Sequence, residues 1–312
     1  MRILFMGTPD FAMLSLKAIY ESGEEIVGVI TTPDKAKGRG MVLTPSPVKK
    51  YALEMGLDVY QPQTLRDGAI LPLLEELKPE LIVVVAYGKI LPEYVLSYAK
   101  HGCINAHASI LPKYRGAAPI QRAIIDGETE TGVSVMRMDA GLDTGDVILT
   151  EKIDILPSDN FETVHDKLVI ASCEGLLKTI ALFKEGKATY TRQGDDFTYA
   201  EKITKDDCFV DFSKSLLSTH NQIRGLSPIP LAFTKMADGK ILKIVSAHTT
   251  DKSAPGAQTG EVVSLDGAIC VKCADGVIAL DIVVPEGKGR MSARDFINGR
   301  KISLGDILGK RS

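Results

Sequence analysis

The first two thirds of the chain alternate short apolar runs with amphipathic stretches whose apolar residues recur every three or four positions. Residues 2–7 form an apolar run, residues 10–20 an amphipathic stretch, and residues 26–31 a second, β-branched run. Buried strands that alternate with helices of this length form βαβ units, in which the strands lie parallel. The pattern predicts an α/β domain with a Rossmann-like, mostly parallel sheet.

The same alternation continues to about residue 183. Further strands are predicted at 58–60, 81–86, 103–108, 131–138 and 147–154, and helices at 48–55, 69–77, 93–99, 119–125 and 161–183. The first turn, residues 7–11, reads Gly-Thr-Pro-Asp-Phe. It lacks the Gly-x-Gly-x-x-Gly that holds a dinucleotide pyrophosphate, which argues against an NAD-linked dehydrogenase.

The C-terminal third has a different pattern, in which a helix at 216–223 precedes short alternating runs separated by turn residues. These runs lie at 232–236, 241–247, 260–264, 268–273 and 277–284. Short strands at this spacing predict a small OB-like β-barrel. We therefore expect a catalytic domain over 1–189, a polar linker over 190–206, and the barrel domain over 207–312.

Composition, 45% hydrophobic and 25% charged, indicates an ordinary soluble globular protein. No apolar run approaches the ~20 residues that span a bilayer, and the N-terminus does not resemble a signal peptide. We therefore expect a cytoplasmic protein. The five cysteines are scattered and odd in number, which argues against a disulfide framework. Cys270 and Cys273 have metal-like spacing, but no second pair completes a tetrahedral site, so no metal is expected.

Charge is distributed unevenly along the chain. Residues 207–312 carry 14 Lys and Arg against 11 Asp and Glu, whereas the whole chain has a net charge of −3. A mildly basic C-terminal part permits a polyanionic partner but does not require one.

Residues 32–50 form a Gly- and Pro-rich segment that is too long for an ordinary βα loop. Its basic residues are Lys35, Lys37, Arg39, Lys49 and Lys50. The segment is either a solvated surface loop or a mobile basic arm that contacts phosphates. Its length and its place beside the first strands favour the arm.

The strand at 103–108 carries the strongest chemical signal. Asn105 and His107 are two residues apart, so their side chains leave the same face of the strand. An amide donor beside a titratable imidazole suits a reaction that builds charge on an oxygen. The plainer alternative is a core histidine next to an asparagine that caps the following turn.

A Gly- and Asp-rich loop at 139–146 follows the strand at 131–138 and offers a carboxylate to the same site. Asp143 is the candidate. Aspartates in such turns commonly stabilise only the turn. The loop also resembles a calcium-binding string, but it lacks the bidentate glutamate that an EF-hand needs.

These motifs together resemble the methionyl-tRNA formyltransferases over nearly the whole chain. The matching stretches are residues 5–11, 38–40, 45–49, 84–88, 102–121, 138–145 and 199–202. The Asn, His and Asp are shared by folate-dependent formyltransferases and indicate the chemistry. The Gly-Arg-Gly loop and the C-terminal barrel indicate the tRNA acceptor.

The resemblance implies formyl transfer from 10-formyltetrahydrofolate to the α-amine of methionyl-initiator tRNA, by a monomer without a metal. Asn105, His107 and Asp143 would be catalytic, and the pterin would lie near the carboxyl ends of the strands at 84–88 and 139–142. The implied folate-binding residues are Val85, Tyr87, Gly88, Ser109, Ile110, Leu111, Pro112, Asp139 and Leu142. The implied tRNA-binding residues are Lys35, Lys37, Arg39, Lys49 and Lys50.

Two departures from the family pattern stand out. Ile110 replaces the usual leucine of Ser-Leu-Leu-Pro, a volume-conserving exchange. The chain has no tryptophan, and Tyr114 takes the aromatic place after the central loop. Rival functions are formyl transfer to an amino sugar nucleotide, hydrolysis of the formyl donor, and non-catalytic nucleic-acid binding.

Overall fold

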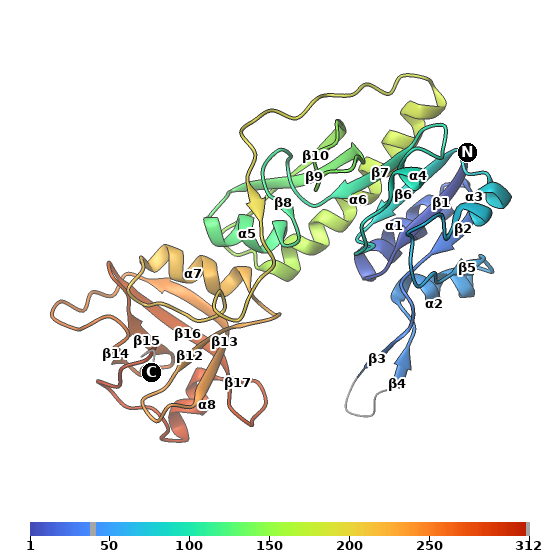
Figure 1. The fold of residues 1–312 in the computed structure, drawn as a ribbon. Coiled ribbons are helices and arrows are strands. Elements are labelled where there is room, and N and C mark those ends of the chain that lie inside the picture. Colours follow the sequence, from blue (N-terminus) through green and yellow to red (C-terminus); the bar gives the residue numbers. More distant parts are fainter. Residues whose placement is uncertain (38–41, 310–312) are drawn as a thin grey trace. The chain divides into compact units, whose positions relative to one another are not determined.

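The computed structural model describes residues 1–37 and 42–309 (Figure 1). The chain divides into two compact units. The first comprises Met1–Gly116, Thr131–Ile153 and Asp166–Tyr199, and the second comprises Ala117–Glu130, Asp154–His165 and the chain from Ala200 onward. The second unit thus includes two short segments from within residues 1–189.

The main sheet of the first unit has the strand order β10-β9-β7-β6-β1-β2-β5. Their bounds are β1 (Arg2–Gly7), β2 (Glu25–Ile30), β5 (Val59–Tyr60), β6 (Leu81–Val85), β7 (Cys103–His107), β9 (Glu130–Arg137) and β10 (Val147–Asp154). The pairs β1–β2, β1–β6, β2–β5 and β6–β7 are parallel, whereas β9 runs antiparallel to β7. The predicted mostly parallel, Rossmann-like sheet is confirmed.

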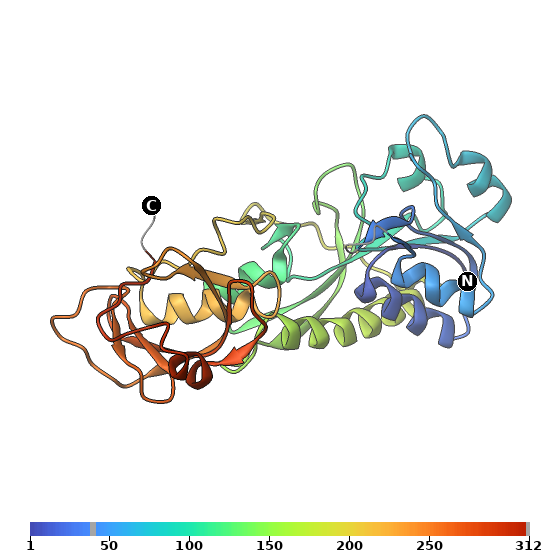
Figure 2. The same ribbon diagram turned by 90° about the horizontal axis from the view of Figure 1, so that it is seen from below.

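Helices cover both faces of this sheet (Figures 1 and 2). On one face α1 (Asp10–Glu21) lies beside α6 (Phe161–Lys184), where the buried hydroxyls of Ser15 and Ser172 are 3.2 Å apart. Helix α2 (Pro47–Glu54) packs beside α1 through an edge-on contact of Tyr20 and Tyr51.

The other face carries α3 (Leu71–Leu77) and α4 (Glu93–Leu96). Leu4 and Met6 of β1 share a core there with Leu74 and Val95, because alternate residues of a strand leave the same face. The helix predicted over 93–99 ends earlier, at Leu96. Beyond it the chain tightens, and the Tyr98 N–H bonds to the carbonyl three residues back.

The segment between β2 and α2 contains a hairpin of β3 (Lys35–Lys37) and β4 (Val42–Thr44), where the sequence predicted only an irregular arm. Arg39 of the predicted arm lies outside the described residues. Helix α2 begins after Ser46 because the Ser46 hydroxyl accepts a hydrogen bond from the Lys49 N–H at 3.1 Å. A 2.8 Å bond to the Thr31 hydroxyl ties this helix start to the end of β2.

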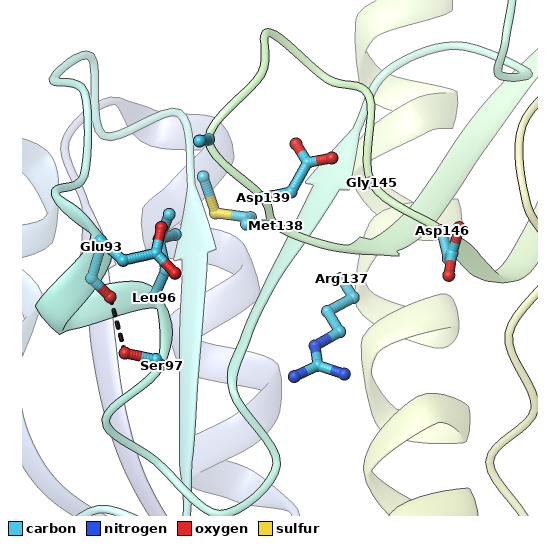
Figure 3. Close-up of a pocket in the computed structure, with 9 residues that line it drawn as sticks. Glu93, Leu96, Ser97, Arg137, Met138, Asp139, Gly145 and Asp146 are labelled. Atoms are coloured by element: carbon cyan, nitrogen blue, oxygen red, sulfur yellow. Dashed lines mark hydrogen bonds between the residues drawn. The ribbon is translucent and has the colours of Figure 1, made fainter.

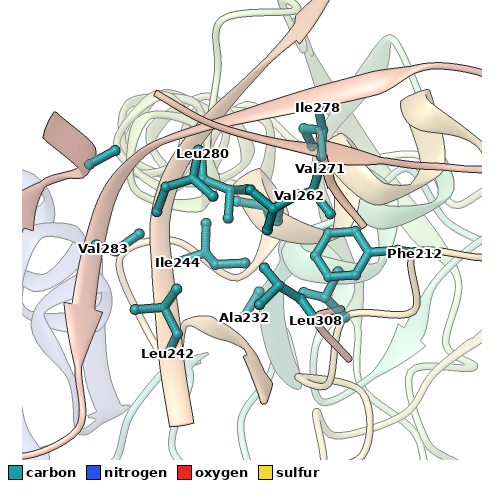
Figure 4. Close-up of a cluster of buried hydrophobic side chains, with 14 of the residues drawn as sticks. Phe212, Ala232, Leu242, Ile244, Val262, Val271, Ile278, Leu280, Val283 and Leu308 are labelled. Carbon is teal, nitrogen blue, oxygen red and sulfur yellow. The ribbon is translucent and has the colours of Figure 1, made fainter. Parts of the chain in front are cut away.

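In the second unit an antiparallel sheet curls around an apolar core. Its strands are β12 (Ala232–Lys235), β13 (Ile241–Thr250), β14 (Val262–Ser264), β15 (Ile269–Lys272), β16 (Val277–Pro285) and β17 (Met291–Ser292). Leu242, Ile244 and Leu280 lie at its centre and are fully buried (Figure 4). The predicted OB-like barrel is confirmed, and β17 and helix α8 (Ala293–Asn298) add to it.

Two helices of the second unit pack closely, α5 (Pro119–Asp126) and α7 (Leu216–Gly225). Gly225 allows this approach, because a Cβ atom there would lie 2.9 Å from a side-chain carbon of Ile125.

Two further short strands, β8 (Arg115–Gly116) and β11 (Tyr199–Ala200), pair with each other. Over the described ranges, no helix combines the length and the apolar character needed to cross a membrane.

Candidate active site

Asn105 and His107 share one face of β7, as the sequence predicts. Cys103 lies on this face too, and its thiol donates to the Val95 carbonyl, which identifies it as the face that carries α4. Asn105 is partly exposed between buried neighbours in β7. Its side-chain amide makes no hydrogen bond within the part of the chain that the structure describes. The amide is therefore available to donate to a bound molecule.

His107 ends β7 and is 6% exposed. Its Nε2 lies 2.9 Å from the Tyr114 carbonyl oxygen. Because a carbonyl only accepts, Nε2 carries a proton and donates it. The other nitrogen, Nδ1, faces a carboxylate oxygen of Asp143 at 3.6 Å, longer than a direct hydrogen bond. The ring is therefore fixed at Nε2, and Nδ1 is left for proton transfer.

Asp143 reaches His107 from a loop and is held there by the backbone. Its Oδ2 accepts a hydrogen bond from the Gly116 N–H at 2.8 Å. Asp143 has a φ of +53°, Tyr114 a φ of +61°, and Ala86, directly after β6, a φ of +45°. Left-handed backbone is uncommon for residues other than glycine and concentrates at functional sites. The structure thus brings the three predicted catalytic residues together.

The loop that carries Asp143 starts far from His107. Because β9 runs antiparallel to β7, Arg137 pairs with Ile104, and the Met138 N–H donates to the Cys103 carbonyl at 2.8 Å. The sequence placed residues 139–142 at the edge where the parallel strands end, and they begin instead beside the start of β7. Residues 139–146 then carry the chain back to His107.

A pocket of about 290 Å³ lies on the same face of the sheet, between α4 and the segment 137–140 (Figure 3). Its lining residues are Glu93, Leu96, Ser97, Arg137, Met138, Asp139, Ala140, Gly145 and Asp146. Leu96, Met138 and Ala140 give the pocket apolar surface, and the charged residues beside them offer polar contacts that can orient a small organic molecule. Its volume is close to the lower end of the ~300–1,000 Å³ range of such sites.

Of the predicted folate-binding residues, the pocket includes Asp139. The Asp139 carboxylate accepts from the Gly141 N–H at 3.0 Å and from the Thr144 hydroxyl at 2.6 Å, so it also shapes its own loop. The sequence did not single out Arg137 or the α4 residues. The available signal was a charged residue at the end of a strand whose preceding residues are buried; Arg137 itself is exposed.

The predicted folate residues 109–112 form a loop that is bonded to β9, with Ser109 and Leu111 buried and Ile110 and Pro112 half-buried. The Ser134 hydroxyl donates to the Ser109 carbonyl at 2.8 Å and accepts from the Leu111 N–H at 3.0 Å. Ser109 is fully buried, and its hydroxyl donates to the Lys113 carbonyl at 2.6 Å. Ser109 is thereby bound within the loop, which argues against a role as a nucleophile.

The other predicted folate residues lie at the end of β6 and in the Asp143 loop. Val85 is buried, Gly88 has a φ of +80°, and Leu142 is 60% exposed. Tyr87 is 2% exposed, and its buried hydroxyl lacks a hydrogen-bond partner in the described chain. Burial raises the pKa of Tyr87 to about 12.

Replacing Tyr87 by phenylalanine should raise the free energy of unfolding of the ligand-free protein by about 1 kcal/mol, because it removes an unpaired buried hydroxyl. Urea unfolding measures this change. If Tyr87 also binds folate, KM for the formyl donor rises up to about tenfold. An unchanged KM would make Tyr87 a core residue only.

The predicted tRNA-binding lysines differ in their surroundings. Lys35 and Lys50 are exposed. The Lys49 ammonium donates to Asp34 and to Gln61, each at 2.7 Å. The hydrogen bonds that the Asp34 carboxylate accepts from Lys49 and from Gln61 lower its pKa. Lys49 therefore already serves to join the base of the arm to the fold.

Gln193 is a residue that the sequence analysis missed. It is half-buried in an otherwise exposed stretch, residues 191–199. Its amide nitrogen donates to the carbonyls of Asp143 and Gly145 at 2.9 and 2.7 Å. Nothing local in the sequence marks it. No cluster of His, Cys, Asp or Glu suited to a metal ion occurs among residues 1–37 and 42–309.

Comparison with known proteins identifies the class. Residues 1–180 match the formyl transferase family, and residues 202–301 match the formyl transferase C-terminal domain family. The α/β sheet and the OB-like unit are thus the two domains of a formyl transferase.

The relatives narrow the family further. The chain is 45% identical over 310 residues to the methionyl-tRNA formyltransferase of Caldanaerobacter subterraneus, covering 99% of this chain and all of the relative. It is 44% identical over 314 residues to that of Geotalea uraniireducens, covering all of this chain and 99% of the relative. The chain belongs to the methionyl-tRNA formyltransferase family.

Solved structures with low sequence identity share the fold. HypX from Aquifex aeolicus in complex with tetrahydrofolic acid superposes with a TM-score of 0.63 at 18% identity, covering all of this chain and 51% of HypX. WlaRD, a sugar 3N-formyl transferase, superposes with a TM-score of 0.66 at 18% identity, covering 93% of this chain and 99% of WlaRD.

Proposed function

We propose that the protein transfers the formyl group of 10-formyltetrahydrofolate to the α-amine of methionyl-initiator tRNA, for translation initiation. The observation that carries this proposal is that Asn105 and His107 share one face of β7 and that Asp143 reaches His107 from the loop at 139–146. We propose that residues 1–189 carry out the transfer, that residues 207–312 bind tRNA, and that 190–206 link them. The enzyme would act as a monomer in the cytoplasm.

The substrates need no protein nucleophile. A neutral amine attacks the formyl carbon directly, the C=O electron pair moves to oxygen, and the resulting tetrahedral species collapses as the bond from carbon to N10 breaks. Across these steps the amine loses one proton and N10 gains one. Ser109 is bonded within its loop, and burial raises the pKa of the Cys103 thiol to about 12, so neither supplies a competing nucleophile.

The three residues divide the work on charge and protons. The Asn105 amide donates to the oxyanion. His107 shares that load and passes a proton toward N10 from Nδ1, because Nε2 is bonded to the Tyr114 carbonyl. Asp143 lies on the Nδ1 side, stabilises positive charge on the ring, and accepts a proton from the amine through water.

The pocket beside α4 fits the pterin of the folate. Leu96 and Met138 offer apolar contact to a flat ring, and Ser97, Arg137 and Asp139 offer polar atoms to its edge. We propose that Val85, Tyr87, Gly88, Leu142 and residues 109–112 complete the folate site around the reacting formyl group.

The direct test is formyl transfer from 10-formyltetrahydrofolate to three acceptors. Methionyl-initiator tRNA should be formylated at least 10² times more efficiently than methionyl-elongator tRNA, and an amino sugar nucleotide should not react. Transfer to the sugar nucleotide alone would retain the catalytic assignment and reject the tRNA assignment. Release of formate without any acceptor would indicate a hydrolase.

We further expect tRNA affinity to fall steeply with salt, because Lys35, Lys37, Arg39 and Lys50 contact phosphates. Lys35→Ala and Lys50→Ala should each reduce the slope of log K for tRNA binding against log salt concentration by about 1. Lys49→Ala should leave the slope nearly unchanged and destabilise the arm, because Lys49 is paired with Asp34. Filter binding over a salt series measures the slopes, and equal slopes for all variants would exclude the arm from tRNA binding.

A further inference from the structure

Gln193 uses its whole amide group to join two parts of the first unit. Its two N–H groups donate to the carbonyls of Asp143 and Gly145. Its oxygen accepts from Nε and Nη2 of Arg115, at 3.0 and 2.7 Å. A primary amide has two donors and two acceptor lone pairs, so every one is used here.

Arg115 is itself held firmly on the other side of this bridge. It is 6% exposed, and its guanidinium lies over the Phe197 ring, 4.6 Å from the centroid. Its backbone N–H donates to the Thr198 carbonyl at 2.9 Å. The planar guanidinium fork therefore has a fixed direction, and it presents two donors to the Gln193 oxygen.

The bridge ends at Asp143, which the proposed mechanism uses beside His107. The Asp143 backbone is left-handed, a conformation that needs support from its surroundings. This backbone directs the carboxylate toward His107. The Gly116 N–H holds the carboxylate, and Gln193 holds the backbone on either side of Thr144. Gly116 directly follows Arg115, so β8 supplies one support of the loop and orients the other, Gln193.

We infer that Gln193, oriented by Arg115, is a positioning residue that fixes the Asp143 carboxylate against His107; this inference rests on the proposed function. Residues 190–206 then do more than link two domains, because the segment contributes to the geometry of the catalytic site. A displacement of about 1 Å at such a site can cost roughly 10² in rate.

The test is a double-mutant cycle of Gln193→Met with Asp143→Ala, after transfer by the wild type to methionyl-initiator tRNA has been measured. Methionine fills the same volume and makes none of the four hydrogen bonds. Gln193→Met should lower kcat about 10- to 100-fold, with KM for both substrates changed less than about threefold. In the Asp143→Ala background, Gln193→Met should lower kcat less than about twofold, because the carboxylate that Gln193 positions is already absent.

Two further variants separate positioning from stability. Gln193→Glu keeps an acceptor for Arg115 and places oxygen against two carbonyls, so kcat should fall while the melting temperature changes little. Gln258→Met, at an exposed glutamine of the second unit, is the matched control and should be neutral.

The outcomes are distinct. Equal losses from Gln193→Met in both backgrounds would show a merely structural role and overturn the inference. If Asp143→Ala lowers kcat and Gln193→Met does not, the inference is overturned and the proposed function stands. A wild type that transfers no formyl group would overturn both.

Discussion

Replacing Asn105 by alanine is expected to lower kcat for formyl transfer about 10²–10³-fold, with KM for both substrates changed less than about threefold. The Asn105 amide has no hydrogen-bond partner among residues 1–37 and 42–309, and the negative charge that it would meet develops only as the amine attacks. A donor aimed at such a charge stabilises the transition state more than the ground state, so its loss lowers kcat. Steady-state formylation of methionyl-initiator tRNA gives both constants.

Two companion variants make the result specific. Asn105→Asp keeps the shape of the side chain but removes the N–H donors and places negative charge near the oxyanion, so its loss should be at least as large. Asn298→Ala, at the exposed end of α8, should be neutral. A raised KM with unchanged kcat in Asn105→Ala would instead make Asn105 a residue for binding the ground state.

The sequence was sufficient for Asn105 and His107 because their relation is local. A strand fixes which side chains share a face, so a spacing of two residues predicts a common face without any knowledge of the rest of the fold. The βαβ pattern similarly fixes the parallel part of the sheet, since short connections through a helix leave few alternatives.

The residues that hold Asp143 in place could not be predicted from local spacing. Gly116 and Gln193 are 27 and 50 residues from Asp143 in the sequence, and only the folded topology brings them to it. The direction of β9 was hidden as well, because helix α5 separates β7 from β9 as in a parallel βαβ unit, and yet the two strands pair antiparallel. That direction decides where the Asp143 loop begins.

Helix α8 was missed although its signal was present. The sequence Ser292-Ala-Arg-Asp295 is a capping-box pattern: the Ser292 hydroxyl accepts from the Asp295 N–H and donates to the Asp295 carboxylate. The helix is only six residues long, too short for a clear apolar periodicity. Capping residues therefore identify short helices that periodicity alone overlooks.

Gly145→Ala should be strongly destabilising, because the loop that carries Asp143 leaves no room at this position. A Cβ atom at Gly145 would lie 1.7 Å from the Arg137 carbonyl oxygen, and a backbone atom cannot rotate away. The loop would have to separate from the end of β9, where the Arg137 N–H donates to the Asp146 carbonyl at 2.9 Å. We expect a loss of about 3 kcal/mol in the free energy of unfolding, measured with urea.

Displacement of this loop should also lower kcat. The Gly145 carbonyl accepts one of the two hydrogen bonds from Gln193, so moving Gly145 also releases Asp143 from its position beside His107. We therefore expect kcat to fall by roughly 10² in the fraction that remains folded. Gly289→Ala is the matched control, because a Cβ atom there meets open space, and it should change neither stability nor kcat. A stable Gly145→Ala enzyme with normal kcat would mean that the loop moves aside without consequence, and that the position of Asp143 is not what limits the reaction.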